Sequence, residues 1–146
     1  MSENNLKQDI QVNAELKTPQ SNSVIGFHNG FCGDFYSDGL LRIDGDFKGT
    51  IKGKGVVLVG EKGRIVGDIY ASSVRIGGKI RGSVFALNKV EILSTGILLG
   101  NLYSPKFLAE EGMIFTGQGK TMKEQDLAEI FKNNVENSQP IITNEF

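Results

Sequence analysis

The chain has 146 residues and a net charge of −1, from 16 Lys and Arg against 17 Asp and Glu. This balance argues against nucleic acid as a partner, and no apolar run approaches the ~18 residues of a membrane-spanning helix. The start of the chain lacks the apolar core of a signal peptide, and the single cysteine, Cys32, cannot form an internal disulfide, so we expect a cytoplasmic protein.

The first segment, residues 1–23, is polar and rich in Asn, Gln and Ser, with no sustained hydrophobic period. A segment of this composition buries too little apolar surface to offset the entropy lost on folding. We therefore expect a disordered N-terminal tail.

A repeat occupies residues 24–119, which hold nearly all the β-branched residues and glycines. Its most regular member is a glycine that recurs every 15 to 18 residues. The recurring glycines are Gly33, Gly49, Gly67, Gly82, Gly100 and Gly117. This period is too short for a helical repeat and indicates a β-solenoid, in which like residues of successive coils lie on one another.

Four columns of apolar residues accompany these glycines. The first column comprises Ile25, Leu41, Val57, Val74, Val90 and Phe107. The second comprises Phe27, Ile43, Val59, Ile76, Ile92 and Ala109. The third comprises Phe31, Phe47, Ile65, Ile80, Leu98 and Phe115, and the fourth Phe35, Ile51, Ile69, Val84 and Leu102, with Gly119 breaking the column. Alternation on a period of two places these residues on the inner face of short strands, where we expect them to form the core.

Two corners account for the glycines. The recurring glycine has inward parity, which indicates a bend where backbone passes close to backbone. A second inward position holds only small residues, namely Ser37, Gly53, Ala71, Ala86 and Ser104. We expect an all-β fold, a parallel β-helix of about six coils, and a right-handed winding because parallel crossovers favour that hand.

The last segment, residues 120–146, is expected to be a tail that contains one short helix. Thr121 and Glu124 fit a capping box at its start. Apolar residues follow at helical spacing, namely Leu127, Ile130, Phe131 and Val135. We expect an amphipathic helix over residues 122–135 and a frayed end near Pro140.

The motifs LRIDGDFKG, VGEKGRIVGDI and SPKFLAEEGMIFTG, with the run V-x-I-x-G-K-I-x-G from Val74 to Gly82, resemble those of the bactofilins. This bacterial family comprises polymer-forming cytoskeletal proteins, and the resemblance covers about residues 24–119. It implies a β-helix polymerisation domain that assembles with itself, without nucleotide, into filaments that scaffold cell-wall enzymes or other cell-envelope and cell-shape machinery. Family members often begin with a short apolar membrane-targeting stretch, of which this chain has only Leu6 and Ile10, so binding at the inner face of the membrane stays open.

The end coils are unusually aromatic. The aromatic residues are Phe27, Phe31 and Phe35 in the first coil and Phe107 and Phe115 in the last. Because the terminal coils of a solenoid leave backbone groups unpaired, we predict that ends meet ends and bury these rings in a polymer interface. The alternative is that the two tails, including the helix, fold over the ends.

No catalytic, cofactor-binding or metal-binding constellation is predicted. His28 is the only histidine and lies in a turn, and Cys32 faces outward without a histidine neighbour in sequence. Asp34 and Asp68 face outward too, but two layers apart at ~10 Å, with Thr50 between them. The glycines of GEKG and GKG are interpreted as turn residues because no helix follows to bind phosphate.

Two other kinds of β-helix protein, one an enzyme and one exported, are alternatives to a scaffold. A left-handed β-helix acyltransferase requires a strict six-residue period and usually a catalytic histidine in a coil. A secreted adhesin or polysaccharide lyase requires an export signal and acidic clusters. The sequence fits neither pattern, so we expect a protein that is not an enzyme and needs no cofactor.

Overall fold

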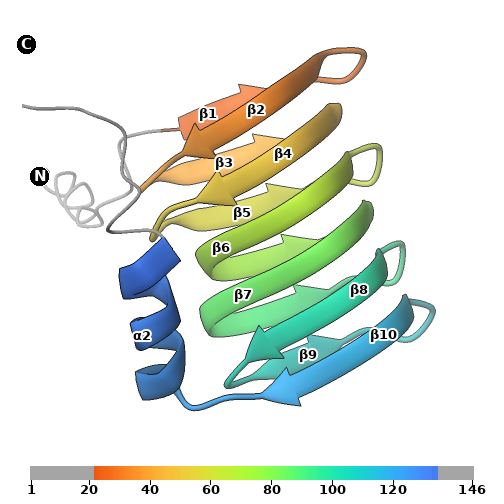
Figure 1. Ribbon diagram of the computed structural model, residues 1–146. Coiled ribbons are helices and arrows are strands. Elements are labelled where there is room, and N and C mark those ends of the chain that lie inside the picture. The colour runs from red at the N-terminus through yellow and green to blue at the C-terminus, as the bar shows by residue number, and fades with distance from the viewer. Residues whose placement is uncertain (1–21, 135–146) are drawn as a thin grey trace, which may run out of the picture.

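The computed structural model describes residues 22–134, which form one parallel sheet wound into a solenoid and one helix (Figure 1). The strands are β1 (Asn22–Ile25), β2 (Gly30–Tyr36), β3 (Leu40–Ile43), β4 (Asp46–Lys52), β5 (Val56–Val59), β6 (Arg64–Ile76), β7 (Lys79–Ile92), β8 (Ile97–Ser104), β9 (Phe107–Ala109) and β10 (Ile114–Thr121). The helix is α2 (Glu124–Asn134). The chain advances in about six right-handed coils, so the predicted fold class is confirmed, and the winding does not fit the left-handed acyltransferase alternative.

Corners divide each coil into three sides. In β6, side A is residues 64–66 before the corner glycine, side B is residues 68–70, and side C is residues 73–76 after the small-residue corner. Figure 1 shows the long strands of sides A and B in front and the short strands of side C behind. β1 begins and β10 ends two residues outside the predicted repeat of 24–119.

The predicted apolar columns lie in register from coil to coil. The second column runs through Ile43, Val59, Ile76, Ile92 and Ala109 on side C. The third runs through Phe31, Phe47, Ile65, Ile80, Leu98 and Phe115 on side A. The interior members of both columns, Ile43, Val59, Ile76, Ile92, Ile65, Ile80 and Leu98, are buried. Packed, mostly β-branched side chains therefore fill the narrow interior.

The corner glycines lie where successive coils touch. Gly67 has a φ of 143°, and a Cβ built on it would lie well inside 3.0 Å of the Gly49 carbonyl oxygen in the preceding coil. No side chain fits between these two backbones. Gly33 differs because no coil of the described chain precedes it, and the nearest atom to a Cβ there is a ring carbon of Phe31 at 3.6 Å.

The register of the first short strand corrects one prediction. β1 pairs with β3 so that Ile25 lies opposite Ile43 and Ser23 lies opposite Leu41. Ile25 therefore belongs to the second column and not to the first. Phe27, predicted to lie in the second column, is in the turn after β1 and is 54% exposed.

The physical reason for this correction is a turn that has two lengths. The Asn29 amide donates to the Gly26 carbonyl at 3.0 Å and closes a four-residue turn that contains Phe27. The same bond recurs in the turn of residues 60–63, whereas β3 and β4 are joined by two residues, 44–45. Sequence spacing alone is consistent with a two-residue turn, which would place Phe27 in the second column. The structure has the four-residue turn instead, which places Ile25 there.

The start of α2 also differs from the prediction. Thr121 is the last residue of β10, and the following Met122 amide still donates to the Ser104 carbonyl at 3.2 Å. The helix therefore begins at Glu124, with the Lys123 carbonyl accepting the Leu127 amide at 3.1 Å. Thr121 does not act as an N-cap because the strand ladder holds it.

The helix packs on the lateral surface of the solenoid. Leu127 and Phe131 are buried, and the Phe131 ring meets Tyr70 edge to face with centroids 5.9 Å apart. Figure 1 shows α2 standing beside the bends that follow side B and not across either end of the stack. Residues 22–23 of the predicted tail, 1–23, belong to β1, and the rest of that tail lies outside the described residues, as do the predictions at Val135 and Pro140.

Candidate polymerisation interface

The two ends of the solenoid present open strand edges. Among residues 22–134, β1 pairs only with β3 and β2 only with β4. At the other end, β9 pairs only with β7 and β10 only with β8 within the same residues. Each terminal strand therefore leaves a row of N–H and C=O groups that no other described strand pairs with. These rows can pair with a further strand placed on either end.

Apolar side chains form the layer at the first end. Phe31 stacks on Phe47 of the next coil, with centroids 5.3 Å apart and planes 10° apart. It also meets Phe35 edge to face at 5.6 Å. Phe31, Phe35 and Ile25 are half-buried and pack against the core from one side. A further coil would bury the surface that they leave exposed.

The last end combines apolar side chains with a hollow. The Phe107 and Phe115 centroids lie 6.0 Å apart, and Phe107 is 40% exposed. Gly119 lies opposite Leu102 where the fourth column needs a side chain. A hollow of about 170 Å³ lies beside Gly119, Phe107 and Phe115. An apolar side chain of a further coil would fit this space.

The structure brings most of the predicted interface residues to the ends. The terminal layers contain Phe31, Phe35, Phe107 and Phe115. Phe27 lies outside these layers, with its centroid 3.9 Å from that of His28 and 5.6 Å from the Lys62 ammonium. Sequence reasoning missed Met113, which packs half-buried against the core at the last end. The sequence signal for Met113 was its position two residues before Phe115, which gives the two side chains the same inward parity.

The other residues singled out in the sequence form no cluster. His28 lies in a turn with a φ of 71°, and Cys32 is an exposed free thiol. Asp34 and Asp68 each lie opposite Thr50, one layer to either side. Within residues 22–134, no group of three or more His, Cys, Asp or Glu residues is placed to hold a metal ion. GKG and GEKG lead into β5 and β6 and not into helices.

Charged pairs lie on the lateral sides. Arg64 donates two hydrogen bonds of 2.8 Å to the Asp46 carboxylate in the preceding coil, which lowers the pKa of Asp46. Tyr70 has a raised pKa, first because it is partly buried and second because Asp68 is nearby. The side chains that pack at the two ends are mainly aromatic and aliphatic, so the ends and the sides differ in chemistry.

An open-ended parallel solenoid with apolar terminal layers is a structure to which like coils can add. Residues 23–120 match the bactofilin family, described as polymer-forming cytoskeletal, and the chain belongs to that family. The resemblance drawn from the sequence motifs is thus confirmed.

Two relatives agree with this assignment. The chain is 32% identical over 109 residues to bactofilin BacO of Myxococcus xanthus (strain DK1622), covering 74% of this chain and 86% of that protein. It is also similar to the Thermus thermophilus bactofilin reconstructed in double helical filaments by cryo-EM, with a TM-score of 0.61 and 27% identity. That match covers 68% of this chain and 99% of the Thermus chain.

Proposed function

We propose that this protein polymerises end to end through its first and last coils into nucleotide-independent filaments that scaffold cell-envelope or cell-shape machinery. The observation that carries the proposal is the pair of ends, each with a strand edge that has no partner among residues 22–134 and with half-buried apolar side chains. Adding a coil at either end would continue the backbone ladder and cover Phe31 or Phe115. The Thermus relative, reconstructed as filaments, supports this mode of use.

A scaffolding role needs surface that polymerisation leaves free. Assembly through the ends would leave sides A, B and C exposed along the whole filament, apart from the strip that α2 covers. Cell-wall enzymes or other envelope proteins would bind to these sides, in the cytoplasm at the inner face of the membrane. Within residues 22–134, no helix has the length and apolar character needed to cross a membrane.

Nucleotide independence is supported by the glycine-rich turns. A phosphate-binding loop presents the N-terminus of a helix to the phosphates, whereas β5 and β6 follow these turns. Assembly without nucleotide, unchanged by adding ATP or GTP with Mg²⁺, is the expected result. A requirement for either nucleotide would contradict this part of the proposal.

The interface is tested with arginine substitutions at the ends. Phe115→Arg and Phe31→Arg each place an unpaired charge in a buried joint, which costs several kcal/mol and weakens that joint on the order of a thousandfold or more. Electron microscopy and sedimentation should show short or monomeric species for each single variant. The double variant should be monomeric.

A matched control separates the ends from the sides. Val66→Arg adds the same charge at a side position that is 48% exposed in the middle of the stack. It should leave filaments intact, and circular dichroism should show that all variants are folded. Wild-type protein that stays monomeric at high concentration, or a double variant that still forms filaments, would overturn the proposal.

A further inference from the structure

Side A carries a cluster of cations that polymerisation through the ends does not use. Its first outward column comprises Gly30, Asp46, Arg64, Lys79, Ile97 and Ile114. Its second comprises Cys32, Lys48, Val66, Arg81, Leu99 and Thr116. We name Lys48, Arg64, Lys79 and Arg81 the basic stripe. These four cations are accompanied by one carboxylate, that of Asp46.

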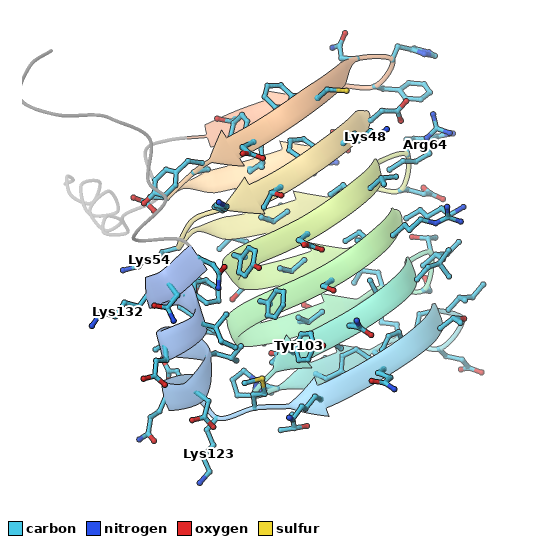
Figure 2. The ribbon with its side chains drawn as sticks, viewed as in Figure 1. Lys48, Lys54, Arg64, Tyr103, Lys123 and Lys132 are labelled. Atoms are coloured by element: carbon cyan, nitrogen blue, oxygen red, sulfur yellow. The ribbon has the colours of Figure 1, made fainter. Side chains whose placement is uncertain are left out.

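Most of the basic stripe has no carboxylate partner among residues 22–134. Arg64 is paired with Asp46, but among the described residues no carboxylate lies within ion-pair distance of Lys48, Lys79 or Arg81. All three are exposed. Figure 2 shows Lys48 and Arg64 extending from the same edge of the solenoid, away from α2. On side C, Arg42 and Arg75 are paired with carboxylates, and Lys89 is an exposed cation of that side with no such pair among the described residues.

Aliphatic side chains share this surface with the cations. Val66 lies between Lys48 and Arg81 in the second column and is 48% exposed. Ile114 is 51% exposed in the first column, beyond Lys79 and Ile97. Side A therefore presents cations in its middle and apolar groups between and beyond them.

A hollow in side A brings the two kinds of side chain together. Its volume is about 490 Å³, and all four members of the basic stripe line it. Val66 contributes apolar surface to the same hollow, whereas the Phe47 and Ile65 side chains beneath it are buried in the core. This volume lies within the ~300–1,000 Å³ range of small-ligand sites. The combination fits an anionic group attached to an apolar one.

We infer that side A is a binding surface for anionic phospholipid, with the basic stripe contacting headgroup phosphates and the aliphatic residues contacting the upper acyl region. Charge complementarity supports this occupant, since the cytoplasmic leaflet is negative and attracts clustered Lys and Arg. Nucleic acid fits less well because its phosphate backbone offers nothing to Val66 and Ile114. An acidic protein partner is the alternative that the experiment must separate.

Polymerisation would strengthen binding to the membrane, and this part of the inference rests on the proposed function. Each subunit adds one basic stripe to the filament, so many weak contacts with one membrane act together. Unpolymerised protein should bind the same vesicles more weakly. The lateral position of side A leaves both ends free, so lipid binding and polymerisation should be separable by mutation.

The test is flotation of the full-length protein with vesicles in a density gradient. Wild type should float with vesicles of phosphatidylcholine mixed with phosphatidylglycerol and not with phosphatidylcholine alone, and salt should weaken the binding. Each cation near such a surface contributes about fivefold in affinity, so K48Q/K79Q/R81Q should lower the affinity per subunit on the order of 100-fold. The control K52Q/K89Q/K106Q removes three exposed or half-exposed cations from sides B and C and their corner, and should bind like wild type.

Several results would overturn the inference. These are a wild type that does not float with the anionic vesicles, a K48Q/K79Q/R81Q variant that floats like wild type, and a control variant that loses binding equally. Binding to polyglutamate without binding to anionic vesicles would assign side A to an acidic protein instead. Electron microscopy of the same variants distinguishes the two proposals. If a variant still forms filaments but no longer floats with vesicles, the polymerisation interface is intact and only lipid binding has been lost. A monomeric Phe115→Arg variant that still binds the anionic vesicles, more weakly, supports side A independently of the filament.

Discussion

Replacing Gly67 and Gly33 by alanine compares a corner that has a coil beneath it with one that has none. Both glycines have φ values in the range that favours glycine, 143° and 132°, so each alanine carries backbone strain of about 1–3 kcal/mol. At Gly67 the new methyl group also collides with the Gly49 backbone. The two coils must then move apart, which weakens ladder hydrogen bonds that contribute about 1 kcal/mol each. We expect Gly67→Ala to lose on the order of 3 kcal/mol more than Gly33→Ala.

The assay is thermal unfolding followed by circular dichroism. A difference on the order of 3 kcal/mol corresponds to a Tm difference on the order of 15 °C for a domain of about 100 residues. Because assembly raises Tm with concentration, both alanine variants should also be measured with Phe115→Arg present. Equal losses of Tm for Gly67→Ala and Gly33→Ala would refute the contact between coils as the reason for glycine. An unchanged Tm for Gly67→Ala would refute the register itself.

Four further predictions concern the core, the helix and Tyr70. Ile80→Asp buries an unpaired charge at a fully buried position and should abolish the fold, so a folded variant with unchanged Tm would contradict the column assignment. Phe131→Ala should cost about 3–5 kcal/mol of helix docking and make α2 cleavable by protease while the strand signal in circular dichroism persists; equal protease resistance would contradict the docking. The same substitution should lower the raised pKa of Tyr70, which ultraviolet titration can follow, because Phe131 helps to bury that ring. Since the folded-state pKa of Tyr70 is raised, its contribution to stability is present below the unfolded pKa and lost as pH rises through the folded value, and Tyr70→Phe should reduce this alkaline loss.

The coil architecture could be predicted because the same pattern is repeated. Each inward position is occupied six times, so single exceptions such as Gly119 do not obscure the column. The glycine at each corner carries independent information, because a contact such as that between Gly67 and Gly49 accepts no other residue. Pattern and steric requirement point to one fold, and this agreement makes the prediction strong.

The errors fall where the repeat gives less constraint. β1 has a pairing partner on one side, and either turn length satisfies the spacing around Phe27. The start of α2 was decided by a hydrogen bond between Met122 and Ser104, which a local capping motif cannot reveal. The basic stripe was visible in the sequence as Lys48 and Arg81, each one residue before a corner glycine. Their common surface depends on register, which the apolar columns provide but composition does not.

The turn between sides C and A accepts two lengths, and this tolerance has a practical use. Turns of two or four residues join equivalent strands in different coils without disturbing the ladder. Glu61 and Lys62, at the tip of one such turn, are exposed. Exposed loop tips of this kind tolerate inserted sequence. A short peptide epitope placed between Glu61 and Lys62 would therefore mark every subunit at the same corner. The spacing between labelled epitopes, measured by immunogold electron microscopy, would give the number of subunits in a given length of filament.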